Sequence, residues 1–480
     1  MLARFFILIL CLSALPVWAD GLPSPVLAAL KAAQIPAANV AVVVHPVAAA
    51  TPLLAHNATQ PMNPASVMKL LTTYAALDLL GPAYTWKTTV AIETAAVDGV
   101  LPGNLYLKGS GDPHFAIEHL WQLLRQVRVR GIRQIEGDLV LDRSAFDLPA
   151  IDPGAFDDKP MRPYNVGPDG LLLNFRTLRF TLLPDNGQPR LLQETPSAGL
   201  RIDNQLRSSP SECGNNWKDL INVRLIPEND GQRLEFTGSY AALCGEKSLH
   251  LAPLAADAQA DGLLRALWQE LGGSLRGRVR SGTIPVGAVK LTEHESAPLA
   301  AAVHDINKFS NNVMARQVFL TLGTSPDGSP ATSEAARQRI NDWLATRNLR
   351  FSELVLDNGA GLSRRERLSA NSLNRLLLDA WRHPAMPEFI ASLPIVGIDG
   401  TMKKRLQASA ASGRAHIKTG TLDGVKTAAG YALDAQGRRH AVTMLINHPR
   451  AQAGAAAIDA LLLWLAQRSQ RDGQLELVDE

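Results

Sequence analysis

Ser66-Val67-Met68-Lys69 places a hydroxyl and an amine three residues apart. A serine hydroxyl is a weak nucleophile until a neighbouring base takes its proton. The apolar residues after Ser66 recur at three- and four-residue spacing up to Gly81, which predicts a helix. Residues three apart on a helix share one face, so Lys69 would stand beside Ser66, and the helix N-terminus would favour an oxyanion. The pattern predicts an activated serine; the alternative is a helix cap followed by a surface lysine.

A second candidate segment is Lys418-Thr419-Gly420-Thr421, on the first of three predicted strands, 416–421, 425–432 and 440–447. Short turns join these strands, which indicates an antiparallel meander. An edge strand can accept an extended peptide, and Gly420 has no side chain to block its approach. Lys418 and Thr419 supply a charge and a hydroxyl for a substrate carboxylate. The Thr421 N–H could pair with that of Ser66 as an oxyanion hole. The alternative is a strand that ends in a turn.

A third element could be a Ser-x-Asn triplet, which would pass protons and hold the substrate backbone. Three triplets fit: Ser310-Asn311-Asn312, Ser369-Ala370-Asn371 and Ser372-Leu373-Asn374. Spacing does not choose among them. The latter two resemble a helix cap, and for any one triplet alone capping is the better explanation.

The sequence motifs of several other enzyme classes are absent from this sequence. There is no G-x-S-x-G elbow and no glycine-rich phosphate loop. His294-Glu295 is not followed by a second histidine at the spacing of a zinc protease. We therefore expect no metal and no cofactor.

The first residues predict export. Arg4 precedes an apolar run from Phe5 to Leu15, and Val17-Trp18-Ala19 ends in a small residue. This order is typical of a secretory signal peptide, here residues 1–19. A lipoprotein signal at Cys11 is the less favoured alternative, because little apolar sequence precedes it. The tail 456–466 is too short to span a membrane, so we expect no transmembrane anchor in the mature protein.

Charge and cysteine content narrow the class further. The formal net charge is +3, with both signs interspersed, so nothing indicates a nucleic-acid partner. Removal of the signal leaves two cysteines, Cys213 and Cys244, and an even count in an exported chain predicts a disulfide.

The roughly 460 remaining residues exceed one ordinary domain. Val40 to Val44 predicts a buried strand, and helical texture occupies 299–322 and 335–343. Between about 88 and 279, short strand-like pieces alternate with turn residues, which predicts a β-rich insertion. One domain would then comprise 20–87 and 280–480.

The order of the motifs resembles that of the penicillin-recognising serine enzymes. Pro64 to Lys69 is similar to their nucleophile helix, and Asn307 to Asn312 to their middle motif, which singles out Ser310. Two further runs, Asp357 to Arg364 and Leu393 to Thr401, resemble segments of the D-Ala-D-Ala carboxypeptidase/endopeptidase group of low-molecular-mass penicillin-binding proteins (class C).

This resemblance implies roles for individual residues. Ser66 would be acylated, with Lys69 as proton acceptor, while Ser310 and Asn312 relay protons and hold the peptide. Lys418 and Thr419 would bind the terminal carboxylate beside Gly420, and the Thr421 N–H would complete the oxyanion hole. Arg364, with Asp157 or Asp158, would contact the side-chain end of the substrate; of the two acids we select Asp158. Ala360 stands where the group often has serine, and Arg365-Glu366-Arg367 is atypical.

The resemblance also implies a fold: an α/β (α+β) transpeptidase domain of the penicillin-binding/β-lactamase type, with an antiparallel sheet flanked by helices. The insertion would form two β-rich subdomains, one nested at about 110–184. The implied function is a periplasmic serine-type D-Ala-D-Ala carboxypeptidase or endopeptidase that trims peptidoglycan stems and cross-links and is acylated by β-lactams. A β-lactamase and a catalytically inactive wall-binding protein are the alternatives.

Overall fold

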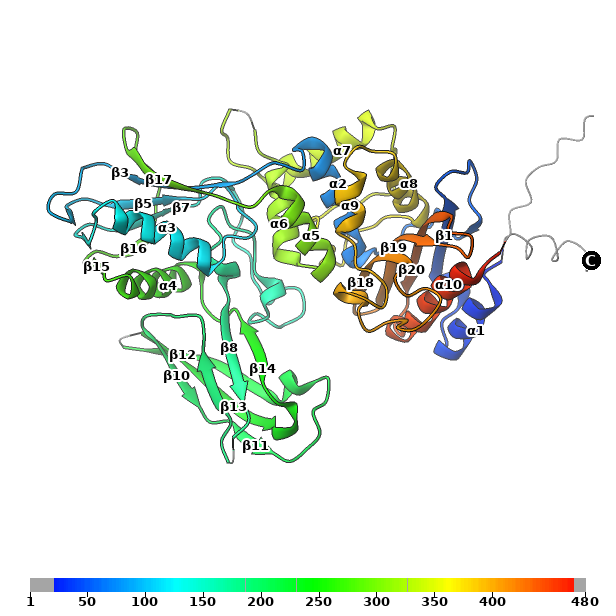
Figure 1. The fold of residues 1–480 in the computed structure, drawn as a ribbon, viewed down its shortest axis with the longest axis horizontal. Helices are drawn as coiled ribbons and strands as arrows, with labels where there is room; N and C mark the ends of the chain where they lie inside the picture. Colours follow the sequence, from blue (N-terminus) through cyan, green and yellow to red (C-terminus); the bar gives the residue numbers. More distant parts are fainter. Residues whose placement is uncertain (1–20, 186, 230, 326, 470–480) are drawn as a thin grey trace, which may run out of the picture.

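The computed structural model describes residues 21–185, 187–229, 231–325 and 327–469 (Figure 1). The expected signal peptide, residues 1–19, lies outside the described residues. Sheets and cores in the described part fall into three units. The first is built from both ends of the sequence, and the other two lie between these ends in sequence and together on one side of the molecule.

The first unit is organised by a five-stranded antiparallel sheet. Its order is β18 (Ala415–Leu422), β19 (Val425–Leu433), β20 (Arg439–Asn447), β1 (Val40–Pro46) and β2 (Leu54–His56). The predicted C-terminal meander is thereby confirmed, and the N-terminal strand extends it. Strand β18 lies at one edge of the sheet.

Helices cover both faces of this sheet, which explains the continuous apolar run in β1. Val40, Val42 and Val44 face the core beneath α1 (Ser24–Ala33) and α10 (Ala455–Gln467). Ala41 and Val43 belong to the core on the other face. The helices of that face are α2 (Lys69–Leu79), α5 (Leu299–Phe309), α6 (Asn312–Thr321), α7 (Ser333–Thr346), α8 (Ala370–Trp381) and α9 (Met386–Ala391). Alternate residues of a strand point to opposite faces, so a strand covered twice is apolar throughout.

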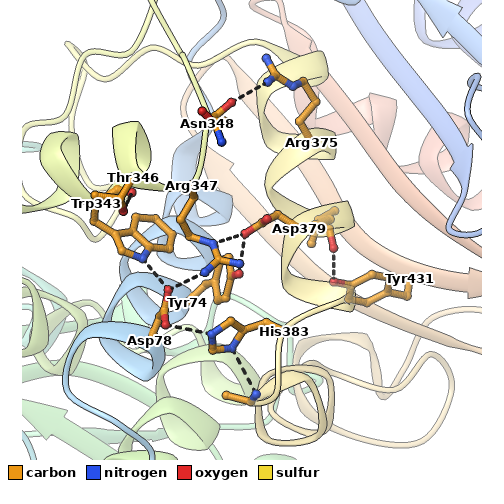
Figure 2. Close-up of polar contacts among 12 residues, drawn as sticks. Tyr74, Asp78, Trp343, Thr346, Arg347, Asn348, Arg375, Asp379, His383 and Tyr431 are labelled. Atoms are coloured by element: carbon orange, nitrogen blue, oxygen red, sulfur yellow. Dashed lines mark hydrogen bonds and ion pairs between the residues drawn. The ribbon is translucent and has the colours of Figure 1, made fainter.

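A polar network behind α2 fixes the end of this helix (Figure 2). The Tyr74 hydroxyl donates to Asp379 at 2.5 Å, and Arg347 bonds both Asp379, at 2.5 Å, and Asp78, at 3.0 Å. The Trp343 indole N–H also donates to Asp78, at 2.8 Å. Helices α2, α7 and α8 are therefore joined by paired charges as well as by apolar packing.

The second unit contains a mixed sheet and two helices that share one core. The sheet order is β16 (Val279–Ser281), β7 (Leu139–Asp142), β5 (Leu105–Lys108), β3 (Lys87–Ile92) and β17 (Val289–Glu295). A small sheet adds β15 (Ser274–Leu275), β6 (Gln134–Ile135) and β4 (Val100–Leu101). The helices are α3 (Ile117–Val129) and α4 (Ala256–Glu270).

The third unit is all strands and 3-10 turns in its described residues. One sheet holds β10 (Leu200–Asn204), β13 (Gly231–Ala241), β11 (Arg207–Ser209) and β12 (Ile221–Glu228). The other holds β14 (Lys247–Leu251), β8 (Leu178–Leu183) and β9 (Arg190–Gln193). The predicted disulfide is confirmed here, since Cys213 is bonded to Cys244.

The bounds of these units differ from those expected. The strands of the inner unit run from 178 to 251, whereas the sequence suggested about 110–184. Strand β17 pairs with β3, so the outer unit reaches residue 295 rather than 279. Turn-separated strands look alike in both units, and only their pairing separates them. We propose these sheets as the domain division of the chain.

No helix within the described ranges is long and apolar enough to cross a membrane.

Candidate active site

Ser66 lies in a short 3-10 helix, Ala65–Met68, that runs directly into α2. Ala65 adopts a positive φ of 47°, and its N–H donates to Asn63 Oδ1 at 2.9 Å. Asn447, at the end of β20, bonds the backbone N–H and C=O of Asn63 at 2.8 and 3.1 Å. The turn that presents the nucleophile is therefore tied to the central sheet. The expected helix is confirmed, but its first turn is tighter than an α-helix.

Lys69 is fully buried beside the serine. Its Nζ lies 3.1 Å from Ser66 Oγ and 2.5 Å from Asn312 Oδ1, and it also bonds the carbonyl oxygen of Ala360. The amide and backbone oxygens only accept hydrogen bonds. A neutral amine has two N–H groups and one lone pair, so these two oxygens take both N–H groups. The lone pair of neutral Lys69 is therefore directed at the Ser66 hydroxyl.

The surroundings of Lys69 favour this neutral form. Burial, together with the positive charges of Lys418 and Arg316, holds the pKa of Lys69 well below its ordinary value, and the charge of Glu366 opposes this shift. Burial and the neighbouring positive charges thus favour the free amine of Lys69, the form that can act as the base predicted from the sequence.

Ser310 and Asn312 occupy the junction of α5 and α6. Ser310 has a left-handed conformation, with φ 59° and ψ 37°, which breaks the chain between the helices. Asn311 caps α6 by accepting the N–H of Met314 at 3.1 Å. The side chain of Asn312 is thereby brought to Lys69, and that of Ser310 to Lys418.

The two other Ser-x-Asn triplets lie elsewhere. Ser369 caps α8 by accepting the N–H of Ser372 at 3.0 Å. Asn374 is buried and donates to the carbonyl of Ala441 at 3.1 Å. The geometry therefore selects the Ser310 triplet, which spacing alone left open.

Lys418, on edge strand β18, is also fully buried. Its Nζ donates to Ser310 Oγ at 2.8 Å and to the carbonyl of Thr419 at 2.7 Å. Burial lowers the pKa of Lys418 to about 7. The beginning of the strand edge is covered, because Ile417 N–H bonds the carbonyl of Pro394 at 2.8 Å. The Thr419 and Thr421 side chains line the cleft beyond this point.

Gly420 brings the strand against the nucleophile. A Cβ at this position would lie 2.2 Å from Thr427 Oγ1, 2.9 Å from Ser66 N and 3.0 Å from Pro64 O. The Thr427 hydroxyl itself donates to Pro64 O at 2.8 Å. Only glycine fits this close approach. The sequence also suggested that glycine is needed here, but for a different reason, namely access by the substrate.

Ser66, Ser310, Asn312, Thr419 and Thr421 line one cleft with a volume of about 770 Å³. Lys69 and Lys418 reach it only through their bonds to Ser66, Asn312 and Ser310. Arg364 lines it too; its Nη1 donates to Asp423 O at 2.9 Å, and its guanidinium stacks on Phe156 at 4.9 Å. Asp157 lines the cleft and accepts the Tyr164 hydroxyl at 2.7 Å, whereas Asp158 is exposed at a turn with φ 57° and is not among the lining residues. Of the two acids considered, the structure places Asp157, not Asp158, in the cleft.

Three contacts in the site were not foreseen. Thr401 Oγ1 lies 2.9 Å from Thr419 Oγ1, and the carbonyl of Ala360 bonds Lys69. Glu366 is fully buried behind Lys69. A contact made by a backbone carbonyl, such as that of Ala360, cannot be predicted from residue types. Glu366 could have been singled out, because the run Arg365-Glu366-Arg367 is atypical of the group.

The fold and the site define a serine acyl-transfer enzyme of the penicillin-recognising class. The chain belongs to the D-Ala-D-Ala carboxypeptidase 3 (S13) family, which matches residues 25–468. It is 29% identical over 443 residues to a D-alanyl-D-alanine carboxypeptidase of Actinomadura sp. (strain R39), covering 89% of this chain and 81% of the relative. It is 24% identical over 420 residues to D-alanyl-D-alanine carboxypeptidase DacB of Haemophilus influenzae, covering 82% of each.

A solved structure shares the fold. The crystal structure of penicillin-binding protein 4 (DacB) from H. influenzae superposes with a TM-score of 0.76 at 22% identity, covering 91% of this chain and 98% of that one. The expected class of fold, an α/β penicillin-binding domain with an antiparallel sheet, is thereby confirmed.

Proposed function

We propose that this chain is a serine-type D-Ala-D-Ala carboxypeptidase that acts on peptidoglycan peptides through an acyl-enzyme on Ser66. The observation that carries the proposal is the buried Lys69 amine, 3.1 Å from the hydroxyl of Ser66. Ser66 lines the same cleft as Ser310, the hydroxyl that Lys418 bonds. Family membership supports the same reaction.

Acylation begins with attack of Ser66 Oγ on the carbonyl carbon of the penultimate D-Ala, while the serine proton passes to Lys69 Nζ. The N–H groups of Ser66 and Thr421 stabilise the oxyanion of the tetrahedral intermediate. Collapse of the intermediate breaks the peptide bond. Lys69, oriented by Asn312 Oδ1, gives up its proton, which the Ser310 hydroxyl can pass to the departing amine, and D-Ala is released.

Deacylation reverses the roles of the groups. Water attacks the ester carbonyl and gives a proton to the Lys69 amine, which passes it to Ser66 Oγ as the C–O bond breaks and the hydroxyl is restored. The products are the shortened peptide with a free carboxylate and the resting enzyme.

Substrate orientation comes from β18. We assign the terminal carboxylate to Lys418 and Thr419, because Lys418 Nζ bonds Ser310 Oγ at the closed end of the strand edge and the Thr419 side chain lines the cleft beside it. The peptide backbone would extend along the edge past Gly420. Arg364 and Asp157 are assigned to the side-chain end of the substrate, since both line the cleft.

An endopeptidase reaction needs no additional group. If the leaving amine belongs to a cross-linked diamino acid, the same steps cut a cross-link instead of a terminal residue. A β-lactam would acylate Ser66 in the same way and remain attached, and a related structure of the H. influenzae protein is described as a complex with a β-lactam. We place the enzyme outside the cytoplasm on the basis of the predicted signal peptide, and in the periplasm on the basis of its family.

Labelling with a fluorescent penicillin tests the proposal. Purified wild-type protein should take up close to one label per chain, and Ser66→Ala should take up none. Equal labelling of the two proteins would show that the nucleophile is misassigned, and no labelling of either would favour an inactive wall-binding protein. Rapid, sustained nitrocefin turnover would instead favour a β-lactamase.

A further inference from the structure

A fully buried carboxylate, Glu366, lies behind the catalytic lysine. Its Oε1 accepts the backbone N–H groups of Asp357 and Asn358 at 3.3 and 3.1 Å. Its Oε2 is buried and has no hydrogen-bond partner among the described residues. An ionisable group in such a position is costly unless other charges compensate it, so its surroundings indicate what it acts on.

Glu366 is joined to Lys69 by one short segment of chain. Residues 357 and 358 bond the Glu366 carboxylate, and Ala360, two residues on, accepts a hydrogen bond from Lys69 Nζ. Gly359 between them accepts the Thr72 hydroxyl at 2.7 Å, which ties the segment to α2. The carboxylate therefore holds the loop that holds the lysine.

The other charges around this carboxylate are few. Arg316 follows Asn312 by one turn of α6, and its Nε is buried with no hydrogen-bond partner in the described ranges. Glu366 and Arg316 interact electrostatically, as do Glu366 and Lys69. Asp357 faces the same region, but its carboxylate is paired with the exposed Arg365. Lys418 acts on Lys69 from the cleft side.

We propose that Glu366 is a positioning residue that, opposed by Arg316, sets the fraction of Lys69 that is neutral and able to take the Ser66 proton. This inference rests on the proposed function and adds to it a group that never touches substrate. Glu366 favours the ammonium form of Lys69, and Arg316 favours the free amine.

The ionisation of Glu366 itself falls in the working range. Burial raises the pKa of Glu366 to about 7, against the opposing effect of the two backbone N–H groups. Lys69 and Glu366 therefore titrate as an interacting pair, in which the proton state of one biases that of the other. As pH falls and Glu366 takes up a proton, its hold on the Lys69 ammonium is released, which extends activity toward acid pH.

The test is the pH profile of acylation by a chromogenic penicillin, measured in single turnover from pH 5 to 9. Glu366→Gln keeps the acceptor oxygen and the side-chain shape but removes the charge. Wild-type Glu366 carries its charge mainly above about pH 7, so in the variant Lys69 should lose its proton at lower pH in that range. The acid limb should move down there, and the rate at pH 8 relative to pH 6 should rise by about threefold to tenfold. Arg316→Gln should shift the acid limb in the opposite direction.

A purely structural role for Glu366 would lower the rate without these opposite shifts. Glu353→Gln is the matched control, since Glu353 also accepts a backbone N–H, that of Ser369 at 3.1 Å, but is not among the charges that act on Lys69. The pH profile of this variant should match that of the wild type. Unmoved acid limbs in both Glu366→Gln and Arg316→Gln would overturn the inference. If Glu366→Gln does not fold, the pH profile of Arg316→Gln is the test. An acid limb in the same position as in the wild type would then overturn the inference.

The labelling end point separates this inference from the proposed function. Complete labelling at Ser66 in every folded variant, with unmoved profiles, refutes only the role of Glu366. Absence of labelling in the wild type refutes the function itself.

Discussion

Gly420→Ala is the substitution that most directly tests the geometry of the site. The added Cβ would lie 2.2 Å from Thr427 Oγ1 and 2.9 Å from Ser66 N. Ordinary van der Waals contact begins at 3.4 Å, so the new Cβ would have to move roughly 1.2 Å away from Thr427 Oγ1 and roughly 0.5 Å away from Ser66 N. Thr427 cannot simply rotate away without giving up its 2.8 Å bond to Pro64 O.

This separation acts on catalysis more than on folding. A displacement of about 1 Å between reacting groups typically costs about a hundredfold in rate, or about 2.7 kcal/mol of barrier. Overpacking of a tightly packed site costs about 1–3 kcal/mol of folding stability, which a domain of this size withstands. We therefore expect a folded protein whose acylation rate falls by about a hundredfold.

The assay is the second-order rate of acylation by a fluorescent penicillin, with thermal unfolding measured in parallel. Thr427→Ala removes the atom in closest conflict, so the double variant should recover part of the rate lost in Gly420→Ala. A double-mutant cycle isolates this coupling from the loss of the Thr427 hydrogen bond. Wild-type acylation by folded Gly420→Ala would refute the claim that strand and nucleophile touch at this point.

Three further outcomes follow from charges and cross-links. Burial lowers the pKa of Lys418 to about 7, so the positive charge proposed to bind a carboxylate is lost as the pH rises through 7. Above that pH, the KM for a peptide that ends in a carboxylate should rise, whereas the KM for the same peptide with a C-terminal amide should not. Burial acts to raise the pKa of Asp78, but the hydrogen bonds and charges of Trp343, His383 and Arg347 outweigh burial and lower it. The ionised Asp78 therefore stabilises the fold at neutral pH, and this stabilisation is lost as the pH falls through the lowered pKa. Asp78→Asn should thus cost about 1–2 kcal/mol of unfolding free energy at pH 7, and the difference from wild type should vanish in acid urea titrations. Loss of the disulfide by Cys213→Ser with Cys244→Ser should destabilise the inner unit by about 3–4 kcal/mol, seen as an earlier unfolding transition, while penicillin labelling persists.

The sequence was most informative where one short segment carries its own geometry. Ser66 and Lys69 share a helical turn, and the C-terminal meander contains its own pairing partners in order. Burial on both faces of β1 followed from its unbroken apolar run. Local periodicity and turn chemistry are sufficient for such features.

Sequence was least informative where distant segments meet. The strands of the two inserted units have similar length and texture, so the sequence suggested an inner unit at about 110–184, whereas the sheets lead us to propose one whose strands run from 178 to 251. Helices α3 and α4 were overlooked because the turn-rich pieces around them dominated the pattern. The choice between Asp157 and Asp158 depended on a single positive φ, which adjacent acids do not reveal. Each of these outcomes is decided by tertiary contacts that no window of sequence contains.

The two buried lysines beside the cleft, Lys69 and Lys418, suit the opposite tasks that we propose for them because their hydrogen-bond partners differ. Lys69 bonds two oxygens that can only accept, Asn312 Oδ1 and Ala360 O, and so a neutral amine there must turn its lone pair to Ser66. Lys418 bonds the Ser310 hydroxyl, which can turn to accept from an ammonium. The positive charge of Lys418 lowers the pKa of Lys69, and the same charge would attract a substrate carboxylate. One ammonium group therefore contributes both to recognition of the chain end and to keeping the neighbouring lysine a free amine.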